Sequence, residues 1–382
     1  MAVYYLLLIS LAGLGFFLTG NRKTQKKTAA YLAVCLFVLT VFATLRYAIG
    51  FDYFSYRSLF DRNASMTAKE ILQAYPYEPL FHLACRAIYL CGLGYQALIG
   101  AVSLFVLSAG MWFLYRHAAL PWMGVYLYIT LQFLAYDMNL MRQAIAVSFF
   151  LLAYPYLLGQ KPVPFFLLVA VGGLFHNSLW FASVLYFLLP KKHSLKWNGC
   201  LVVAALAAYL NFDRMFACAK PLLPDKYAAY EYSYFWNAST FSYVVPAGLY
   251  MVLIFLFRRR IASETRRTIY CSSALYHFLI SLFITKHFIL ERFAVYPFIF
   301  SLAAIPEIIA SYQNDFYQDA SCQDKNSSSC KTAGKRAYYL VMLLFVLYGG
   351  AYFLFAASKG FHHVYPYTSL FDKSISVPAA AS

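Results

Sequence analysis

Charged residues are scarce in this sequence, and acidic ones are the scarcest. Only 12% of the 382 residues are charged, with 15 Asp and Glu against 31 Lys and Arg, whereas 62% are hydrophobic. Soluble globular domains contain about 25% charged and about 45–50% apolar residues. This shortage of charge excludes an ordinary soluble protein.

Motifs that bind metals or nucleotides are also missing. The 8 cysteines are scattered, without the Cys-x-x-Cys or Cys/His spacing of a zinc site or a redox pair. No glycine-rich phosphate loop of the Walker or Rossmann type occurs, which argues against an ATP-driven pump. We therefore expect no disulfide framework, no metal and no cofactor.

Long apolar runs dominate what is present, and they recur from Val3 to Phe355. About 20 apolar residues cross a hydrocarbon core of about 30 Å as a helix. The strands of membrane barrels are shorter and alternate in polarity, so they do not fit these runs. The sequence predicts an all-α polytopic membrane protein, a single integral domain over residues 1–382 with no soluble domain.

Basic residues fall in short clusters between the apolar runs, and four clusters are expected to face the cytoplasm. The net charge of +16 therefore indicates orientation in a membrane rather than nucleic-acid binding. This pattern fits about 12 transmembrane helices with both chain ends outside. The expected spans are residues 3–19, 29–47, 96–115, 118–134, 143–159, 162–176, 178–190, 198–211, 241–257, 268–285, 290–310 and 338–357.

Four longer segments lie outside these spans. They are an outer loop at 48–95, an outer loop at about 212–240, a cytoplasmic connector at about 311–337 and an extracytoplasmic tail at 358–382. The first loop holds an apolar stretch at about 80–93 that is too short to span, so we expect a helix on the outer interface. The connector is rich in Ser, Asn, Asp and Lys and is not expected to form a core.

Polar side chains that interrupt the apolar sequence gather on the predicted outer side. They are Asp52, Tyr53 and Arg57 in "GFDYFSYRSLF", Glu78 before a proline, Asn139, Arg142 and Gln143 in "NLMRQ", His176 in "FHNSLW" and Arg292 in "ERFAVY". A charged side chain in or near a membrane needs a partner or water, and it commonly marks a functional site.

Each of these residues also has a plain structural explanation. Arg142 could extend to the interface by its flexible stem, and His176 could be a hydrogen-bonded interface histidine. Asp52 could pair with Arg57. Glu78 could cap the helix that follows it, because acidic residues are favoured at helix N-termini.

At these residues the chain resembles a known family. The stretch "GFDYFSYRSLF" is similar to a Gly-x-Asp-Tyr-x-x-Tyr loop, "NLMRQAIAVS" resembles an Asn-x-x-Arg-Gln-x-x-Ala helix start, and "FHNSLW" resembles a Phe-His-x-Ser step. Together with "YEPLF", "ERFAVY" and "YPYTSLF" in the same order, they extend the likeness over nearly the whole chain. The family is the EpsG-like, Wzy-type group of bacterial polysaccharide polymerases of capsule, exopolysaccharide and O-antigen loci.

The resemblance implies an enzyme of the glycosyltransferase type in the bacterial cytoplasmic membrane. Such a polymerase joins undecaprenyl-diphosphate-linked oligosaccharide repeat units at the outer face of that membrane. Its implied partners are the lipid-linked glycans, the bilayer, a flippase and a chain-length regulator, with no nucleic acid.

The implied reaction assigns roles to the polar residues. Arginines can stabilise a departing diphosphate, because a guanidinium stays charged and binds phosphate oxygens in pairs. Arg142 is the first candidate for this contact and Arg292 the second, and either Asp52 or His176 is the base for the sugar hydroxyl. The further residues expected to contact the diphosphate or the glycan are Arg57, Asn139, Gln143, Tyr53 and Glu78.

Two other classes of protein share some of these features. A membrane-bound polysaccharide O-acyltransferase would also combine many spans with His and Arg near the membrane face. A flippase or another transporter of lipid-linked oligosaccharides would carry charged residues along a central cavity. The predicted spans are nearly free of charge at their centres, which counts against transport.

Overall fold

The computed structural model describes most of the chain, and its regular structure is helical. The described residues are 1–20, 24–192, 194–222, 232, 243–321 and 328–372. Among them no strand is longer than an isolated bridge between Arg46 and Ser369. The prediction of an all-α membrane protein is confirmed by these helices and by their apolar composition.

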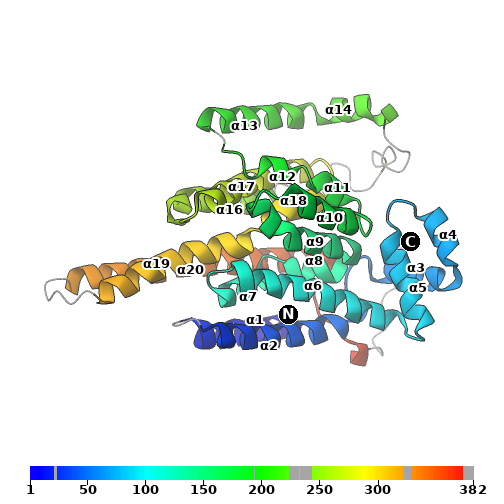
Figure 1. Cartoon of the computed structure of the whole chain (residues 1–382), viewed down its shortest axis with the longest axis horizontal. Helices are drawn as coiled ribbons and strands as arrows, with labels where there is room; N and C mark the ends of the chain where they lie inside the picture. The colour runs from blue at the N-terminus through cyan, green and yellow to red at the C-terminus, as the bar shows by residue number, and fades with distance from the viewer. Residues whose placement is uncertain (21–23, 193, 223–231, 233–242, 322–327, 373–382) are drawn as a thin grey trace. The chain divides into compact units, whose positions relative to one another are not determined.

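The chain forms two compact units. The first consists of Met1–Trp180 together with Leu302–Ser382, and the second is Phe181–Ser301. The main helices of the first unit are α1 (Ala2–Thr19), α2 (Gln25–Thr44), α3 (Tyr53–Ser65), α4 (Ala68–Ala74), α5 (Pro79–Leu90), α6 (Tyr95–His117), α7 (Pro121–Thr130), α8 (Phe133–Asn139), α9 (Met141–Leu158), α10 (Pro162–Gly173), α19 (Ser301–Ser321) and α20 (Ser328–Ser358) (Figure 1).

The second unit is built from shorter helices. After α11 (Ser178–Ala182), which lies at the boundary, they are α12 (Leu185–Leu188), α13 (Leu195–Leu210), α14 (Phe212–Ala219), α16 (Val244–Phe257), α17 (Glu264–Ile284) and α18 (Glu291–Phe298). Within this unit α17 packs against both α16 and α18. The predicted outer loop at about 212–240 falls mostly outside the described residues.

Six helices among the described residues are long and apolar enough to cross a membrane. They are Ala2–Thr19, Gln25–Thr44, Tyr95–His117, Met141–Leu158, Phe288–Tyr317 and Gly334–Ser358, with a seventh if Lys196–Leu210 and Phe212–Leu222, bent by 74°, form one broken span. Other expected spans correspond to shorter helices, such as α7 with 10 residues and α10 with 12. The protein is therefore multi-pass, and the total of about 12 spans stays a prediction.

The segment 48–95 folds into three helices. Asp52 is the N-cap residue of α3 without a capping hydrogen bond from its side chain, although an acidic residue there is favoured by the helix dipole. Thr67 caps α4 reciprocally with Glu70, whose carboxylate accepts the Thr67 backbone N–H at 2.6 Å. Pro79 opens α5, which is favourable because the first helical residue needs no N–H partner. Besides the expected helix near 80–93, this loop thus contains α3 and α4.

Apolar side chains of α3, α5, α6 and α9 form a common core beneath this segment. Its members include Tyr53, Tyr56, Phe60, Phe81, Cys85, Tyr95, Leu98, Ile99, Met141, Ala144 and Ile145. Burying a large side chain of this kind stabilises a fold by about 1.5–3 kcal/mol. The core therefore fixes α3 and α5 against the start of α9.

The C-terminal segment returns to the end of α2. Backbone hydrogen bonds join Tyr47 to Thr368 at 3.0 Å and Leu370 to Leu45 at 2.9 Å. The ring of Tyr367 stacks on Phe42, with ring centroids 4.2 Å apart. Residues 373–382 of the predicted tail lie outside the described residues.

Helices α19 and α20 extend into the predicted connector at 311–337, which the sequence did not suggest. Only residues 322–327 of it lie outside the described helices. Gln313 is buried and donates to the Gly20 carbonyl at 2.6 Å, and Phe316 stacks on Tyr338 with centroids 6.4 Å apart. These contacts explain why the two helices continue beyond their apolar parts (Figure 1).

Candidate functional site

Glu78 joins two side chains that are distant in the sequence. Its Oε2 atom lies 2.9 Å from Arg142 Nη1, and its Oε1 atom lies 2.8 Å from His176 Nδ1. The backbone N–H of Asn177 also donates to Oε1, at 2.8 Å. We call Glu78, Arg142 and His176 the Glu78 cluster.

Three helix ends bring this cluster together. Glu78 immediately precedes α5, Arg142 lies in the first turn of α9, and His176 follows the end of α10. The Leu80 backbone N–H donates to the Leu174 carbonyl at 3.2 Å, which ties the start of α5 to the end of α10. Helices α9 and α10 pack against each other along their lengths. The site thus lies where the ends of three helices meet.

The environment of Glu78 keeps its carboxyl group ionised. Burial raises the pKa of Glu78, but the hydrogen bond and charge of His176, the Arg142 charge and the Asn177 N–H lower it to about 2. The side chains of Glu78 and His176 are each 12% exposed, and that of Arg142 is 28% exposed. Because an ionised carboxylate only accepts hydrogen bonds, His176 donates to Glu78 through Nδ1–H.

Tyr56 is a member of this site that the sequence analysis missed. Its hydroxyl oxygen accepts the Arg142 backbone N–H at 3.4 Å, and its ring centroid lies 5.9 Å from Arg142 Cζ. Burial raises the pKa of Tyr56, while the Arg142 charge opposes the shift. The available signal was its position four residues after Asp52, because residues four apart share one face of a helix.

Asp52 lies beside the Glu78 cluster, at the start of α3. Its backbone N–H donates to Asn139 Oδ1 at 3.1 Å. The Asp52 carboxylate interacts electrostatically with Arg142 and Tyr56. Asp52 therefore remains a second candidate for the base.

Asn139 connects three segments of the first unit. Besides accepting from Asp52, its side-chain nitrogen lies 2.9 Å from His362 Nδ1 of the C-terminal segment. Asn139 is 4% exposed. It positions the start of α3 and the C-terminal segment, and its expected contact with substrate stays a prediction.

The loop before α3 approaches Asn139 so closely that a side chain at Gly50 would not fit. Gly50 has φ +96°, and an added Cβ would lie 2.9 Å from Asn139 Oδ1. Gly92 has φ +74°, but an added Cβ there would meet nothing within 4 Å. Substitution of Gly92 therefore introduces backbone strain alone, whereas substitution of Gly50 introduces the same strain and a steric clash.

We expect Gly50→Ala to lower the thermal stability of the purified protein more than Gly92→Ala does. Both variants carry the penalty of a left-handed residue, about 1–2 kcal/mol, and Gly50→Ala adds the clash with Asn139. Thermal unfolding in detergent measures the difference. Equal destabilisation by the two substitutions would contradict the described approach of this loop to Asn139.

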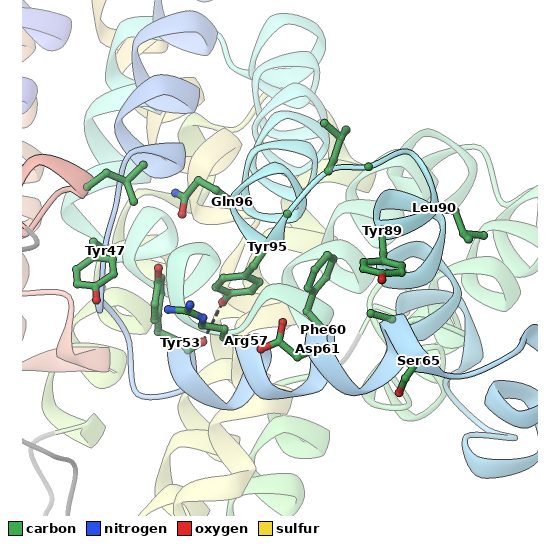
Figure 2. A pocket seen from close by; sticks show the side chains of 15 residues that line it. Tyr47, Tyr53, Arg57, Phe60, Asp61, Ser65, Tyr89, Leu90, Tyr95 and Gln96 are labelled. Carbon is green, nitrogen blue, oxygen red and sulfur yellow. Dashed lines mark hydrogen bonds between the residues drawn. The ribbon is translucent and has the colours of Figure 1, made fainter.

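The other predicted site residues lie elsewhere. Gln143 is 1% exposed inside α9. Tyr53 and Arg57 line a separate cavity of about 1040 Å³ beside α3 (Figure 2). Arg292 lies on α18 in the second unit. The predicted roles of these four residues stay predictions.

Arg46 is a buried charge that the sequence analysis counted as part of an ordinary span. It is 1% exposed, and its Nη1 atom donates to the Ala43 carbonyl at 2.5 Å and to Ser103 Oγ at 3.4 Å. The signal was a lone arginine at the end of an apolar run, beside the loop "GFDYF".

No group of three or more His, Cys, Asp or Glu side chains could hold a metal ion within the part of the chain that the structure describes. The functional groups of the Glu78 cluster are a guanidinium, an imidazole and a carboxylate.

Apolar helices that carry a charged cluster at their ends define a multi-pass membrane protein with a polar site. The chain belongs to the EpsG family, whose model matches residues 29–320. This range contains all three members of the Glu78 cluster, and the family is one of membrane proteins of polysaccharide biosynthesis. No curated protein and no solved structure matches the chain.

Proposed function

We propose that the chain polymerises lipid-linked oligosaccharides. It would transfer a growing glycan from undecaprenyl diphosphate to a sugar hydroxyl of the next lipid-linked repeat unit, at the outer face of the cytoplasmic membrane. The observation that carries this proposal is the Glu78 cluster, which holds a guanidinium and an imidazole on one ionised carboxylate. Family membership supports the substrate class.

The reaction has two chemical requirements. The bond between the anomeric carbon and the diphosphate oxygen breaks, and a bond forms from the anomeric carbon to the acceptor oxygen. The protein must stabilise the negative charge that develops on the diphosphate. It must also accept the proton of the acceptor hydroxyl. A diphosphate leaves as a stable anion, so the acid that glycosidases use for a poor leaving group is not required.

Arg142 suits the first requirement. Its pair with Glu78 uses Nη1, its side chain is 28% exposed, and its buried Nε has no hydrogen-bond partner within the described residues. A guanidinium presents several N–H groups in a fixed plane, so it can bind two phosphate oxygens while one N–H stays on Glu78. Arg292 is the second proposed contact, on the family resemblance.

His176 suits the second requirement better than Asp52 does. The hydrogen bond from Nδ1–H to Glu78 orients the imidazole, and in this proposal Nε2 is the atom that accepts the proton of the acceptor hydroxyl. A carboxylate that orients a histidine in this way also stabilises the imidazolium that forms, as in the serine protease triad. His176 would take the proton, and Glu78 would position it.

A complementation experiment tests the proposed function in cells. Deletion of the gene should abolish long polymer and accumulate single repeat units on the lipid, and the wild-type gene should restore the ladder on a gel. A polysaccharide O-acyltransferase would instead change the acyl content of a polymer of normal length. If the protein were a flippase or another transporter, deletion of its gene would leave the lipid-linked units inaccessible from outside. Either of these two results would contradict the proposal.

A further inference from the structure

A cavity of about 1040 Å³ lies against α3, separate from the Glu78 cluster (Figure 2). Its walls come from α3, from the end of α5, from the turn that leads into α6, and from Tyr47 and Leu370 on the two segments that the chain joins by backbone hydrogen bonds. Pockets for small ligands measure about 300–1,000 Å³. This cavity could therefore hold more than one sugar ring.

Helix α3 separates the cavity from the Glu78 cluster. Tyr53, Arg57 and Asp61 follow one another at intervals of four residues and line the cavity. Tyr56 lies on the neighbouring face and contacts Arg142. Because residues four apart share a face of a helix, one short helix presents different rows of side chains to the two sites.

The lining of the cavity combines flat rings with groups that bind hydroxyls. Tyr53 and Tyr95 form an edge-to-face pair with centroids 5.4 Å apart, and Tyr89 is 50% exposed on the α5 side. Arg57 and Asp61 are exposed, and neither forms an ion pair within the described residues. Figure 2 shows both charged side chains on the α3 side of the cavity.

We propose that this cavity binds the glycan portion of the lipid-linked substrate. A carboxylate accepts hydrogen bonds from sugar hydroxyls, a guanidinium donates to hydroxyl and ring oxygens, and an aromatic face packs on the apolar C–H face of a sugar ring. One cation and one anion together select a hydroxyl-rich ligand over a strongly charged one. The inference rests on the proposed function, because it names the site for the sugar chain of that reaction.

The same aromatic residues could instead belong to the belt that anchors a membrane protein at the lipid headgroups. The two explanations differ in which molecule occupies the cavity, a glycan or a lipid. Only a glycan site requires that Arg57, Asp61 and Tyr89 all contribute to the binding of one soluble oligosaccharide.

A binding measurement separates these explanations and does not require catalysis. The probe is a fluorescent oligosaccharide, released from the accumulated lipid-linked units by mild acid and mixed with purified full-length protein in detergent. We expect Asp61→Asn and Tyr89→Ala each to weaken its binding by about tenfold, equivalent to about 1.4 kcal/mol. The matched controls are Arg62→Gln, an exposed charge next to Asp61, and Tyr115→Ala, an exposed tyrosine on α6 outside the cavity.

The controls and Arg142→Ala should bind the oligosaccharide as the wild type does, because none of these residues lines the cavity. Unchanged binding by both cavity variants would overturn the inference. So would displacement of the probe by phosphatidylglycerol but not by unlabelled oligosaccharide. If the wild type binds the oligosaccharide but never extends a chain, the cavity assignment stands and the proposed polymerase function fails.

Discussion

Arg142→Lys should reduce polymer synthesis by about 10²–10³-fold, nearly as much as Arg142→Ala, because the loss of one preorganised contact to a developing negative charge has this size. Lysine keeps the charge beside Glu78, so the buried carboxylate retains a cation. It lacks the planar fork that can bind two phosphate oxygens and Glu78 together.

Polymer length on a gel, together with single repeat units accumulated on the lipid, measures this effect. Protein level in the membrane must be measured alongside, because a structural pair would also affect folding. Arg116→Lys, at the far end of α6, is the matched control. Polymer of normal length from Arg142→Lys would mean that Arg142 only pairs with Glu78.

The second large effect concerns the base. His176→Ala should lower the rate of chain extension by about 10²–10⁴-fold, the range of general base catalysis. Asp52→Asn should retain most activity, because its backbone N–H can still bond to Asn139. Glu78→Gln should lie between the two, since it removes the charge that orients His176 and leaves a side chain of the same shape.

Initial rates with purified variants of equal thermal stability measure this order. If Asp52→Asn were inactive and His176→Ala active, Asp52 would be the base and the Glu78 cluster would serve only to bind the diphosphate.

The pH dependence of the protein's stability tests the ionised state of Glu78. Glu78 has a lowered pKa, so the stability that it contributes is present above about pH 4.5 and is lost as the pH falls toward about 2.

The sequence indicated Glu78, Arg142 and His176 as site residues, but not that Glu78 joins the other two. Arg142 and His176 were identified by polarity within apolar runs, whereas Glu78 was expected to cap α5 or to touch substrate. Glu78 lies 64 residues from Arg142 and 98 from His176. A contact over such separations depends on how α5, α9 and α10 pack, and no local pattern encodes it.

The number and shape of the helices were harder to predict for a related reason. Hydropathy identifies long apolar runs, but it does not show where a helix breaks. Gln132 has φ +71°, and Leu140 lies at φ −100° and ψ 60°, so α7, α8 and α9 are separate helices. The break at Leu140 creates a new helix N-terminus at Met141, and Arg142 lies in the first turn of α9.

Buried polar contacts also escaped the sequence analysis. Tyr56 lies within a quoted motif, four residues after Asp52, but its contact with Arg142 depends on how α3 packs near the start of α9. His362 reaches Asn139 across 223 residues. Arg46 is nearly fully buried among aromatic side chains, which hydropathy cannot distinguish from an exposed arginine at a helix end.

The most direct test of the central claim is the stoichiometry of a reconstituted reaction. Wild-type protein in vesicles receives lipid-linked repeat units isolated from cells that lack the gene, and released undecaprenyl diphosphate and new glycosidic linkages are counted together. The account predicts one lipid diphosphate released for each linkage formed, with both counts reduced in step by Arg142→Lys. Release of diphosphate without a glycan ladder, or a ladder of normal rate from Arg142→Lys, would contradict it.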